Sequence, residues 1–292
     1  MRGTPKRRST RAGVFAAGVL ALALTVASCA STPASGGTLD EIKSSGVARV
    51  GFANEAPFAY STSDGQLAGF MPAALTTVFS GMGDIKLEGV LAEFSGLIPG
   101  VQAGRFDLVG AGLYINPERC QQALPSNPVY TAAEGMAVKT GNPLGLASYG
   151  DLVAKGARFG TVTGSINLSY ATDAGFKEAD VVLFPDVPSA LAALQADRVD
   201  AVGMSAISLQ NVMTNTNATQ VELAEPFTPP EGANAYGAVY FNKDDKALVD
   251  AFNAELAKVV ESGALLKAYE ELGFGGELLP PTDVTAEQLC AG

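Results

Sequence analysis

The sequence predicts an α/β protein with two lobes, each built on a parallel-rich sheet, and with two strands that carry the chain between the lobes as a hinge. Strand-like and helix-like segments alternate along the chain, which is the order that produces parallel sheets. The segment 102–110 returns at 195–203 with six of nine residues identical, although an Ala-, Gly- and Val-rich chain could produce this match by chance. The 292 residues with 47% apolar content are enough for two cores.

The first lobe is expected to open with an apolar strand and then to alternate. Each copy of the near-repeat ends a helix-like run, turns at Gly104 or Asp197, and starts a short apolar strand. The expected strands are 48–52, 86–91 and 107–110, and the expected helices are 72–82, 97–103 and a short one from Pro117.

The second lobe is expected to repeat this alternation. Its expected strands are 158–162, 181–184, 200–204 and 220–223, and its expected helices are 148–155, 166–174, 188–196 and 206–214. Two strand-like segments, 135–139 and 236–242, bracket the lobe and are expected to be the crossings. A double crossing of this kind forms a hinge, which usually closes around a ligand.

The returning chain is expected to complete the first lobe with helices at 246–262 and 264–272. The first lobe would then consist of residues 39–138 and 237–292, and the second of residues 139–236.

The N-terminus is typical of an export signal. Five basic residues precede an uncharged run at 12–27, which is too short to span a bilayer comfortably, so residues 1–28 are expected to be a signal peptide. The run closes in Val-Ala-Ser-Cys, which resembles the bacterial lipobox and predicts that Cys29 carries lipid. Ordinary cleavage with an incidental Cys29 is the alternative. Residues 29–38 have linker composition, so we expect a protein anchored by lipid at the outer face of the cell membrane.

Composition excludes several classes of function. The chain contains no histidine, which rules out Ser-His-Asp and Cys-His catalytic sets and histidine metal sites, and it has no glycine-rich phosphate loop, so no cofactor or metal is expected. The net charge of −11 excludes nucleic-acid binding by a general electrostatic route. In an exported protein Cys120 and Cys290 most simply form a disulfide, with two unpaired thiols as the alternative.

A candidate binding site begins at the carboxyl end of the first strand, where ligands bind in open α/β sheets. Glu55 and Phe58 follow that strand, in a turn that Pro57 restricts. Phe94 and Tyr114 follow the next two strands. An exposed Glu55 and ordinary core packing of the three aromatic residues are the alternatives.

Arg119 is placed to bind an anion. Asn116 and Pro117 form a good helix start just before it, and a helix N-terminus favours negative charge. A guanidinium there suits a carboxylate, unless Arg119 is a solvated surface residue. In the second lobe the turn 163–167, which contains Ser165 and Asn167, could take the other face of the same carboxylate with its N–H groups; a plain N-cap by Ser165 is equally compatible.

These segments together resemble a known family. Residues 51–60, 95–107, 114–120 and 287–292 are similar to those of the solute-binding proteins of ABC importers, in the family that binds polar amino acids with a two-lobed, type II periplasmic-binding fold. Within that family the chain is most similar to the ectoine- and hydroxyectoine-binding proteins. The resembling tail also supports the pairing of Cys120 with Cys290.

The resemblance implies a role for each candidate. Phe58, Phe94 and Tyr114 would form an aromatic box for a delocalised cation, Glu55 would be its counter-charge, and Arg119 would bind the carboxylate. Aromatic faces compete well with water for such weakly hydrated cations. Binders of ordinary α-amino acids in the family carry an aspartate where this chain has Ser205, so a standard amino acid would lose a charged contact there.

The leading hypothesis is therefore a monomeric binding lipoprotein, not an enzyme, that captures a small zwitterion such as ectoine and presents it to an ABC permease. Three alternatives remain open at this stage: a polar amino-acid-binding protein of the same class, a dehydratase or lyase with Glu55 as general acid, and a sensory or adhesive surface lipoprotein.

Overall fold

The computed structural model describes residues 37–230, 233 and 235–291. The signal peptide 1–28, Cys29 and most of the linker 29–38 lie outside the described residues and stay predictions. Among the helices that are described, none combines the length and the apolar character needed to cross a bilayer.

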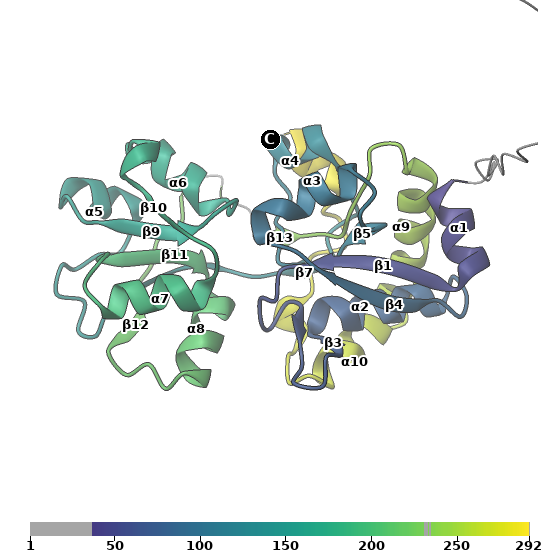
Figure 1. Ribbon diagram of the computed structural model, residues 1–292, viewed down its shortest axis with the longest axis horizontal. Helices are drawn as coiled ribbons and strands as arrows, with labels where there is room; N and C mark the ends of the chain where they lie inside the picture. The colour runs from purple at the N-terminus through teal and green to yellow at the C-terminus, as the bar shows by residue number, and fades with distance from the viewer. Residues whose placement is uncertain (1–36, 231–232, 234, 292) are drawn as a thin grey trace, which may run out of the picture. The chain divides into compact units, whose positions relative to one another are not determined.

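The first sheet has five strands in the order β4-β1-β5-β14-β6 (Figure 1). Strands β4, β1 and β5 run parallel, whereas β14 is antiparallel to both of its neighbours. Their bounds are β1 (Val47–Phe52), β4 (Lys86–Leu91), β5 (Leu108–Val109), β6 (Leu124–Pro125) and β14 (Tyr240–Phe241).

Helices cover the first sheet because their apolar stripes face it. In α9 the buried residues recur at helical spacing, from Leu248 through Phe252 to Leu256 and Val259. The helices of this part are α1 (Thr38–Ser45), α2 (Phe70–Ser80), α3 (Leu97–Gln102), α4 (Pro117–Gln122), α9 (Lys246–Glu261), α10 (Ala264–Glu270) and α11 (Ala286–Ala291). In Figure 1, α3 and α4 are drawn above β1 and β4, and α2 and α10 below.

The second sheet repeats the first, with the order β10-β9-β11-β8-β12. Strands β10, β9 and β11 are parallel, and β8 is antiparallel to β11 and β12. The strands are β8 (Glu134–Lys139), β9 (Phe159–Val162), β10 (Val182–Phe184), β11 (Ala201–Ser205) and β12 (Val221–Leu223). The helices are α5 (Tyr149–Ala154), α6 (Asn167–Asp173), α7 (Val187–Gln195) and α8 (Ala206–Asn215).

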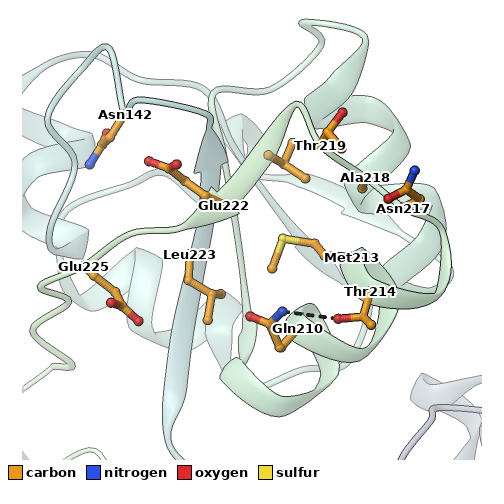
Figure 2. A pocket seen from close by; sticks show the side chains of 11 residues that line it. Asn142, Gln210, Met213, Thr214, Asn217, Ala218, Thr219, Glu222, Leu223 and Glu225 are labelled. Carbon is orange, nitrogen blue, oxygen red and sulfur yellow. Dashed lines mark hydrogen bonds between the residues drawn. The ribbon is translucent and has the colours of Figure 1, made fainter.

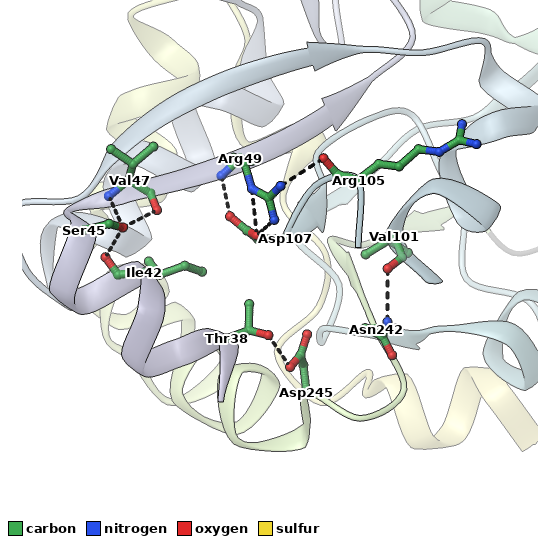
Figure 3. A network of polar contacts seen from close by, with 10 residues as sticks. All are labelled: Thr38, Ile42, Ser45, Val47, Arg49, Val101, Arg105, Asp107, Asn242 and Asp245. Carbon is green, nitrogen blue, oxygen red and sulfur yellow. Dashed lines mark hydrogen bonds and ion pairs between the residues drawn. The ribbon is translucent and has the colours of Figure 1, made fainter. Parts of the chain in front are cut away.

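The near-repeat has the same structural role in both sheets. The Asp107 carboxylate accepts hydrogen bonds from the backbone N–H, Nε and Nη2 of Arg49, at 2.8, 3.1 and 2.5 Å (Figure 3). The Asp200 carboxylate accepts the same three from Arg158, at 2.8, 3.0 and 2.6 Å. Each aspartate therefore ties the start of one parallel strand to its neighbour, which makes the two sheets similar in build and not merely in sequence.

The chain passes between the sheets through a short antiparallel pair, β7 (Tyr130–Thr131) with β13 (Tyr236–Gly237). The segment 135–139, which we expected to be a crossing, is instead part of β8 and pairs with β11 and β12. Its residues are buried on both faces, as expected for a strand inside a sheet covered by helices, and its pairing places it between β11 and β12. The first crossing therefore precedes Glu134, and the division into lobes otherwise stays a prediction.

Three further features complete the fold. Gly237 packs so closely on the Tyr130 ring that a Cβ there would overlap it. At the C-terminus, α11 lies against α4 and brings Cys290 to Cys120, with the sulfur atoms 2.00 Å apart and the Cα atoms 5.8 Å apart, as in a disulfide. A small hairpin of β2 (Tyr60–Ser61) and β3 (Leu67–Ala68) follows the predicted site turn.

Candidate functional site

Glu55 lies just beyond β1, where its carboxylate is buried although the residue as a whole is partly exposed. Its Oε1 accepts a 2.6 Å hydrogen bond from the Ser208 hydroxyl in the first turn of α8, and its Oε2 has no hydrogen-bond partner among the described residues. The hydrogen bond joins the loop after β1 to the second sheet's helix. Glu55 is therefore not the exposed surface acid of the alternative reading.

Phe58 lies beside this carboxylate, and Tyr114 is connected to Phe58 through the Tyr130 ring. A Cβ on Gly112 would fall 2.9 Å from Glu55 Oε2 and 3.0 Å from Phe58 Cγ, so both side chains reach the same point of the backbone. The Tyr130 ring links the two predicted aromatic residues, with ring centroids 5.1 Å from Phe58 and 6.1 Å from Tyr114. Phe58 and Tyr114 also belong to the hydrophobic core, so the core-packing role that the sequence left open applies to both of them.

Arg119 is buried, with only 8% of its surface exposed. The Asn116 side chain caps α4 by accepting from the Arg119 backbone N–H at 2.8 Å, as the sequence predicts. The guanidinium donates from Nη1 to the Tyr114 carbonyl at 2.8 Å and from Nη2 to the Gly164 carbonyl at 3.1 Å, and it lies 6.0 Å from the centre of the Phe94 ring. Arg119 is thus a buried cation in contact with two of the predicted site segments.

The turn 163–167 lies close to the backbone at Ser95, in the segment that follows β4 of the first sheet. Gly164 has a left-handed φ of +82°, and a Cβ there would fall 2.8 Å from the Ser95 Cα, so only glycine suits this approach. Ser165 is not the N-cap of α6, because the cap position is Ile166 without a side-chain bond. The Ser165 hydroxyl instead pairs with the Thr161 hydroxyl at 2.8 Å, which leaves it engaged within its own lobe.

Asn167 contacts Glu134, a buried acid that the sequence did not predict as a site residue. Its Nδ2 donates to Glu134 Oε2 at 2.6 Å and to the Tyr149 hydroxyl at 2.8 Å. Glu134 is 8% exposed, and its Oε1 is buried without a hydrogen-bond partner among the described residues. A sequence signal existed, since Glu134 is the only charged residue between Arg119 and Lys139 and stands at the start of an apolar strand.

The two carboxyl groups and the guanidinium form one electrostatic unit. Burial raises the pKa of Glu55 to about 7, although its hydrogen bond to Ser208 and the charge of Arg119 oppose the rise. Burial likewise raises the pKa of Glu134 to about 7; Asn167 and Arg119 oppose this rise and the charge of Glu55 adds to it. Near neutral pH the site can therefore hold either a proton or a ligand's positive charge at each acid.

Ser205 is the ladder partner of Glu134. It is 5% exposed, pairs with Glu134 across the β11–β8 ladder, and its hydroxyl has no hydrogen-bond partner among the described residues. We expected the second lobe to lack negative charge here because residue 205 is a serine. Glu134 supplies that charge from the neighbouring strand, so the serine alone does not exclude an α-ammonium group.

Two cavities flank the site, and both are lined by Phe94. One of about 110 Å³ also has Glu55 and Met204 in its wall, and one of about 190 Å³ has Arg119 and Ser165. A larger hollow of about 660 Å³ lies on α8 and β12, away from these residues, and Glu222 and Gln210 are among its polar lining (Figure 2). It contains no cationic side chain to complement its acids, so it does not form a zwitterion site.

Among the described residues, no group of three or more Cys, Asp and Glu side chains is arranged to hold a metal ion. The arrangement offers two buried acids, one buried cation and three aromatic rings. Such a set binds a small molecule with a positive and a negative end.

The fold is that of a solute-binding protein. The chain belongs to the bacterial extracellular solute-binding proteins, family 3, whose pattern matches residues 48–275. It is a binding protein of the amino-acid ABC transporter type with the two-lobed type II fold, so the predicted family and fold class are confirmed.

Three known proteins illustrate the relationship. A probable amino-acid ABC transporter periplasmic-binding protein, y4tE of Sinorhizobium fredii, is 33% identical over 264 residues, which are 87% of this chain and 86% of the relative. The crystal structure of EhuB in complex with hydroxyectoine shares 38% identity with a TM-score of 0.80, over 87% of this chain and 98% of EhuB. The ancestral amino acid-binding protein AncCDT-1, a precursor of cyclohexadienyl dehydratase, shares 25% identity with a TM-score of 0.68, over 81% and 99%.

Proposed function

We propose that this protein captures a small zwitterion with a charge-delocalised cation, of the ectoine and hydroxyectoine class, and delivers it to an ABC permease. One observation carries the proposal. A buried acid, Glu55, lies beside the Phe58 ring, and a buried guanidinium, Arg119, lies beside the Phe94 ring and donates to the Tyr114 carbonyl. Such a site matches a ligand that is positive and flat at one end and carries a carboxylate at the other.

Each end has a physical reason. Burying Arg119 and Glu55 without partners would cost several kcal/mol per ion, and a ligand with complementary charges offsets that cost. Each aromatic face contributes about 0.5 to 2 kcal/mol toward a desolvated cation. The 38% identity to EhuB, solved with hydroxyectoine, supports the same ligand class.

Export and anchoring belong to the proposal as well. The basic leader, the sixteen-residue uncharged run and the Val-Ala-Ser-Cys close support cleavage before Cys29 and lipidation of that cysteine. A monomer tethered by one lipid and a short linker could then present its ligand to a permease in the same membrane.

The test is a thermal-shift and calorimetric panel. Ectoine and hydroxyectoine should raise the melting temperature of the mature protein, because a ligand selective for the folded form stabilises it by mass action. Glutamate, arginine and glutamine should not. Equal or larger shifts from these amino acids would refute the ligand class and leave a family 3 amino-acid-binding protein, an alternative that Glu134 beside Ser205 favours.

The enzyme alternative has one supporting observation. A dehydratase or lyase using Glu55 needs a second titrating group, and Glu134, with a pKa raised to about 7, is one. NMR of small carboxylic acids, cyclohexadienyl acids among them, incubated with the protein decides the question. Turnover that Glu55→Gln abolishes would establish an enzyme, and unchanged spectra together with tight ligand binding would exclude it.

A further inference from the structure

Glu134 is a second buried acid, which belongs to the second sheet, whereas Glu55 follows a strand of the first sheet. It is the first residue of β8, immediately after the crossing segment, and two residues earlier the Ala132 carbonyl accepts a 3.0 Å hydrogen bond from the Tyr114 hydroxyl. The backbone before Glu134 is thereby fixed to one of the aromatic residues of the site. The negative charges of Glu134 and Glu55 both act on the Tyr114 hydroxyl, whose pKa is raised chiefly by burial.

Glu55 contacts the start of α8, and Glu134 pairs through its backbone with the residue that precedes this helix. Glu55 Oε1 accepts from Ser208 in the first turn of that helix, and Glu134 lies across the ladder from Ser205, the residue before it. A helix N-terminus favours nearby negative charge, which suits the Glu55 carboxylate at α8. The charge of Glu55 also acts on Glu134, so the two acids lie within electrostatic reach of one another.

Each of the two glutamates has one carboxylate oxygen that accepts no hydrogen bond from the described residues. Asn167 occupies Glu134 Oε2 and Ser208 occupies Glu55 Oε1, whereas Glu134 Oε1 and Glu55 Oε2 are buried without hydrogen-bond partners among the described residues. Buried carboxylate oxygens without donors are rare in folded proteins, because each costs its full desolvation penalty. Asn167, itself held to the Tyr149 hydroxyl, fixes which Glu134 oxygen is left to accept a further donor.

We propose that Glu134 contacts the ligand directly, so that the ligand's cationic head donates N–H bonds to two carboxylates at once, Glu55 from one lobe and Glu134 from the other. Asn167 is then a positioning residue for Glu134 and not a ligand contact. The inference rests on the proposed binding function, but it does not depend on ectoine. It requires a head with at least two N–H donors, which amidinium, guanidinium and primary ammonium groups provide and a trimethylammonium group does not.

The experiment is calorimetry of the mature protein with ectoine, arginine and glycine betaine, for the wild type and Glu134→Gln. Glu178→Gln, an exposed acid of the second lobe, is the matched control. Glutamine keeps the shape and loses the charge, so E134Q should weaken any N–H-bearing ligand by about tenfold or more. Any affinity for betaine, and all affinities of E178Q, should change less than about twofold.

A second readout separates ligand contact from a structural role. Wild-type protein should release protons on binding near pH 6.5, measured from the heats in two buffers of different ionisation enthalpy, and E134Q should release fewer. If E134Q fails to fold, Glu134→Asp keeps the charge but withdraws it by one methylene group, and it should lose about tenfold as well.

Three results would overturn the inference: wild-type affinity retained by E134Q for N–H-bearing ligands, equal losses for these ligands and betaine, or a wild type that prefers betaine or binds none of the panel. A switch of ligand from ectoine to arginine, with the E134Q effect intact, would refute only the ectoine assignment. Ectoine binding without an E134Q effect would refute only this inference.

Discussion

Replacing Glu55 by glutamine should make the ligand-free protein more stable at alkaline pH while removing ligand binding. The pKa of Glu55 rises from 4.5 to about 7 in the folded protein. Between these values the folded state holds a proton that the unfolded chain has released, so the unfolding free energy falls as pH rises through this window. At about 1.4 kcal/mol per pH unit, the loss approaches ~3 kcal/mol at pH 8.

Glu55→Gln removes that loss, so its melting temperature at pH 8 should exceed that of the wild type by roughly 6 to 12 °C, and the two should coincide near pH 4. Urea unfolding at pH 4, 6 and 8 measures the difference, with Glu178→Gln as the exposed control. Ser208 and Arg119 act on the Glu55 carboxylate, and its charge acts on Glu134, Tyr114 and Tyr130; all five residues remain in the variant. Because Glu134 also titrates, some slope should persist, although parallel curves for E55Q and wild type would refute burial of the carboxylate.

The other predictions concern single groups described above. Arg119→Lys replaces a fork that reaches two carbonyls by a point charge, so ligand affinity should fall by about tenfold to a hundredfold in calorimetry; unchanged affinity would remove Arg119 from the site. Replacing both Cys120 and Cys290 by alanine should lower the unfolding free energy by up to ~5 kcal/mol in non-reducing urea titrations, and free thiols detected in the wild type would contradict the bond. Asp107→Asn and Asp200→Asn should each lower the unfolding free energy by about 1 kcal/mol in urea titrations, because the partner arginines, Arg49 and Arg158, are half exposed and water weakens both ion pairs. Strongly unequal losses would contradict the structural equivalence of the two pairs.

Most elements of the fold could be predicted because local pattern and tertiary demand agree. The strand expected at 86–91 is β4, and the helix expected at 246–262 is α9 within one residue. The near-repeat located equivalent strands of the two sheets. The crossing was misplaced because 135–139 is apolar enough for any buried strand, and periodicity cannot tell which sheet such a strand joins.

The site was only partly predictable for a different reason. Glu55 and Arg119 follow recognisable strand-end and helix-start signals, so the sequence located them. Glu134 follows neither, and its importance depends on the antiparallel pairing that places it beside Ser205. A cap by Ser165 is one of two interpretations that the sequence leaves open, because serine before a helix often is one, whereas its observed partner Thr161 comes from the preceding strand.

The close fit of Gly237 against Tyr130 has a consequence for substitutions in the crossing. The same glycine bridges to Tyr114 on its other side, and Tyr130 touches the Phe58 ring, so the crossing between the two sheets contacts two of the residues that we propose bind the ligand. A bulkier residue at position 237 would displace the Tyr130 ring and disturb those two residues. Under the proposed function, a substitution in this crossing would therefore change ligand affinity as well as the crossing itself.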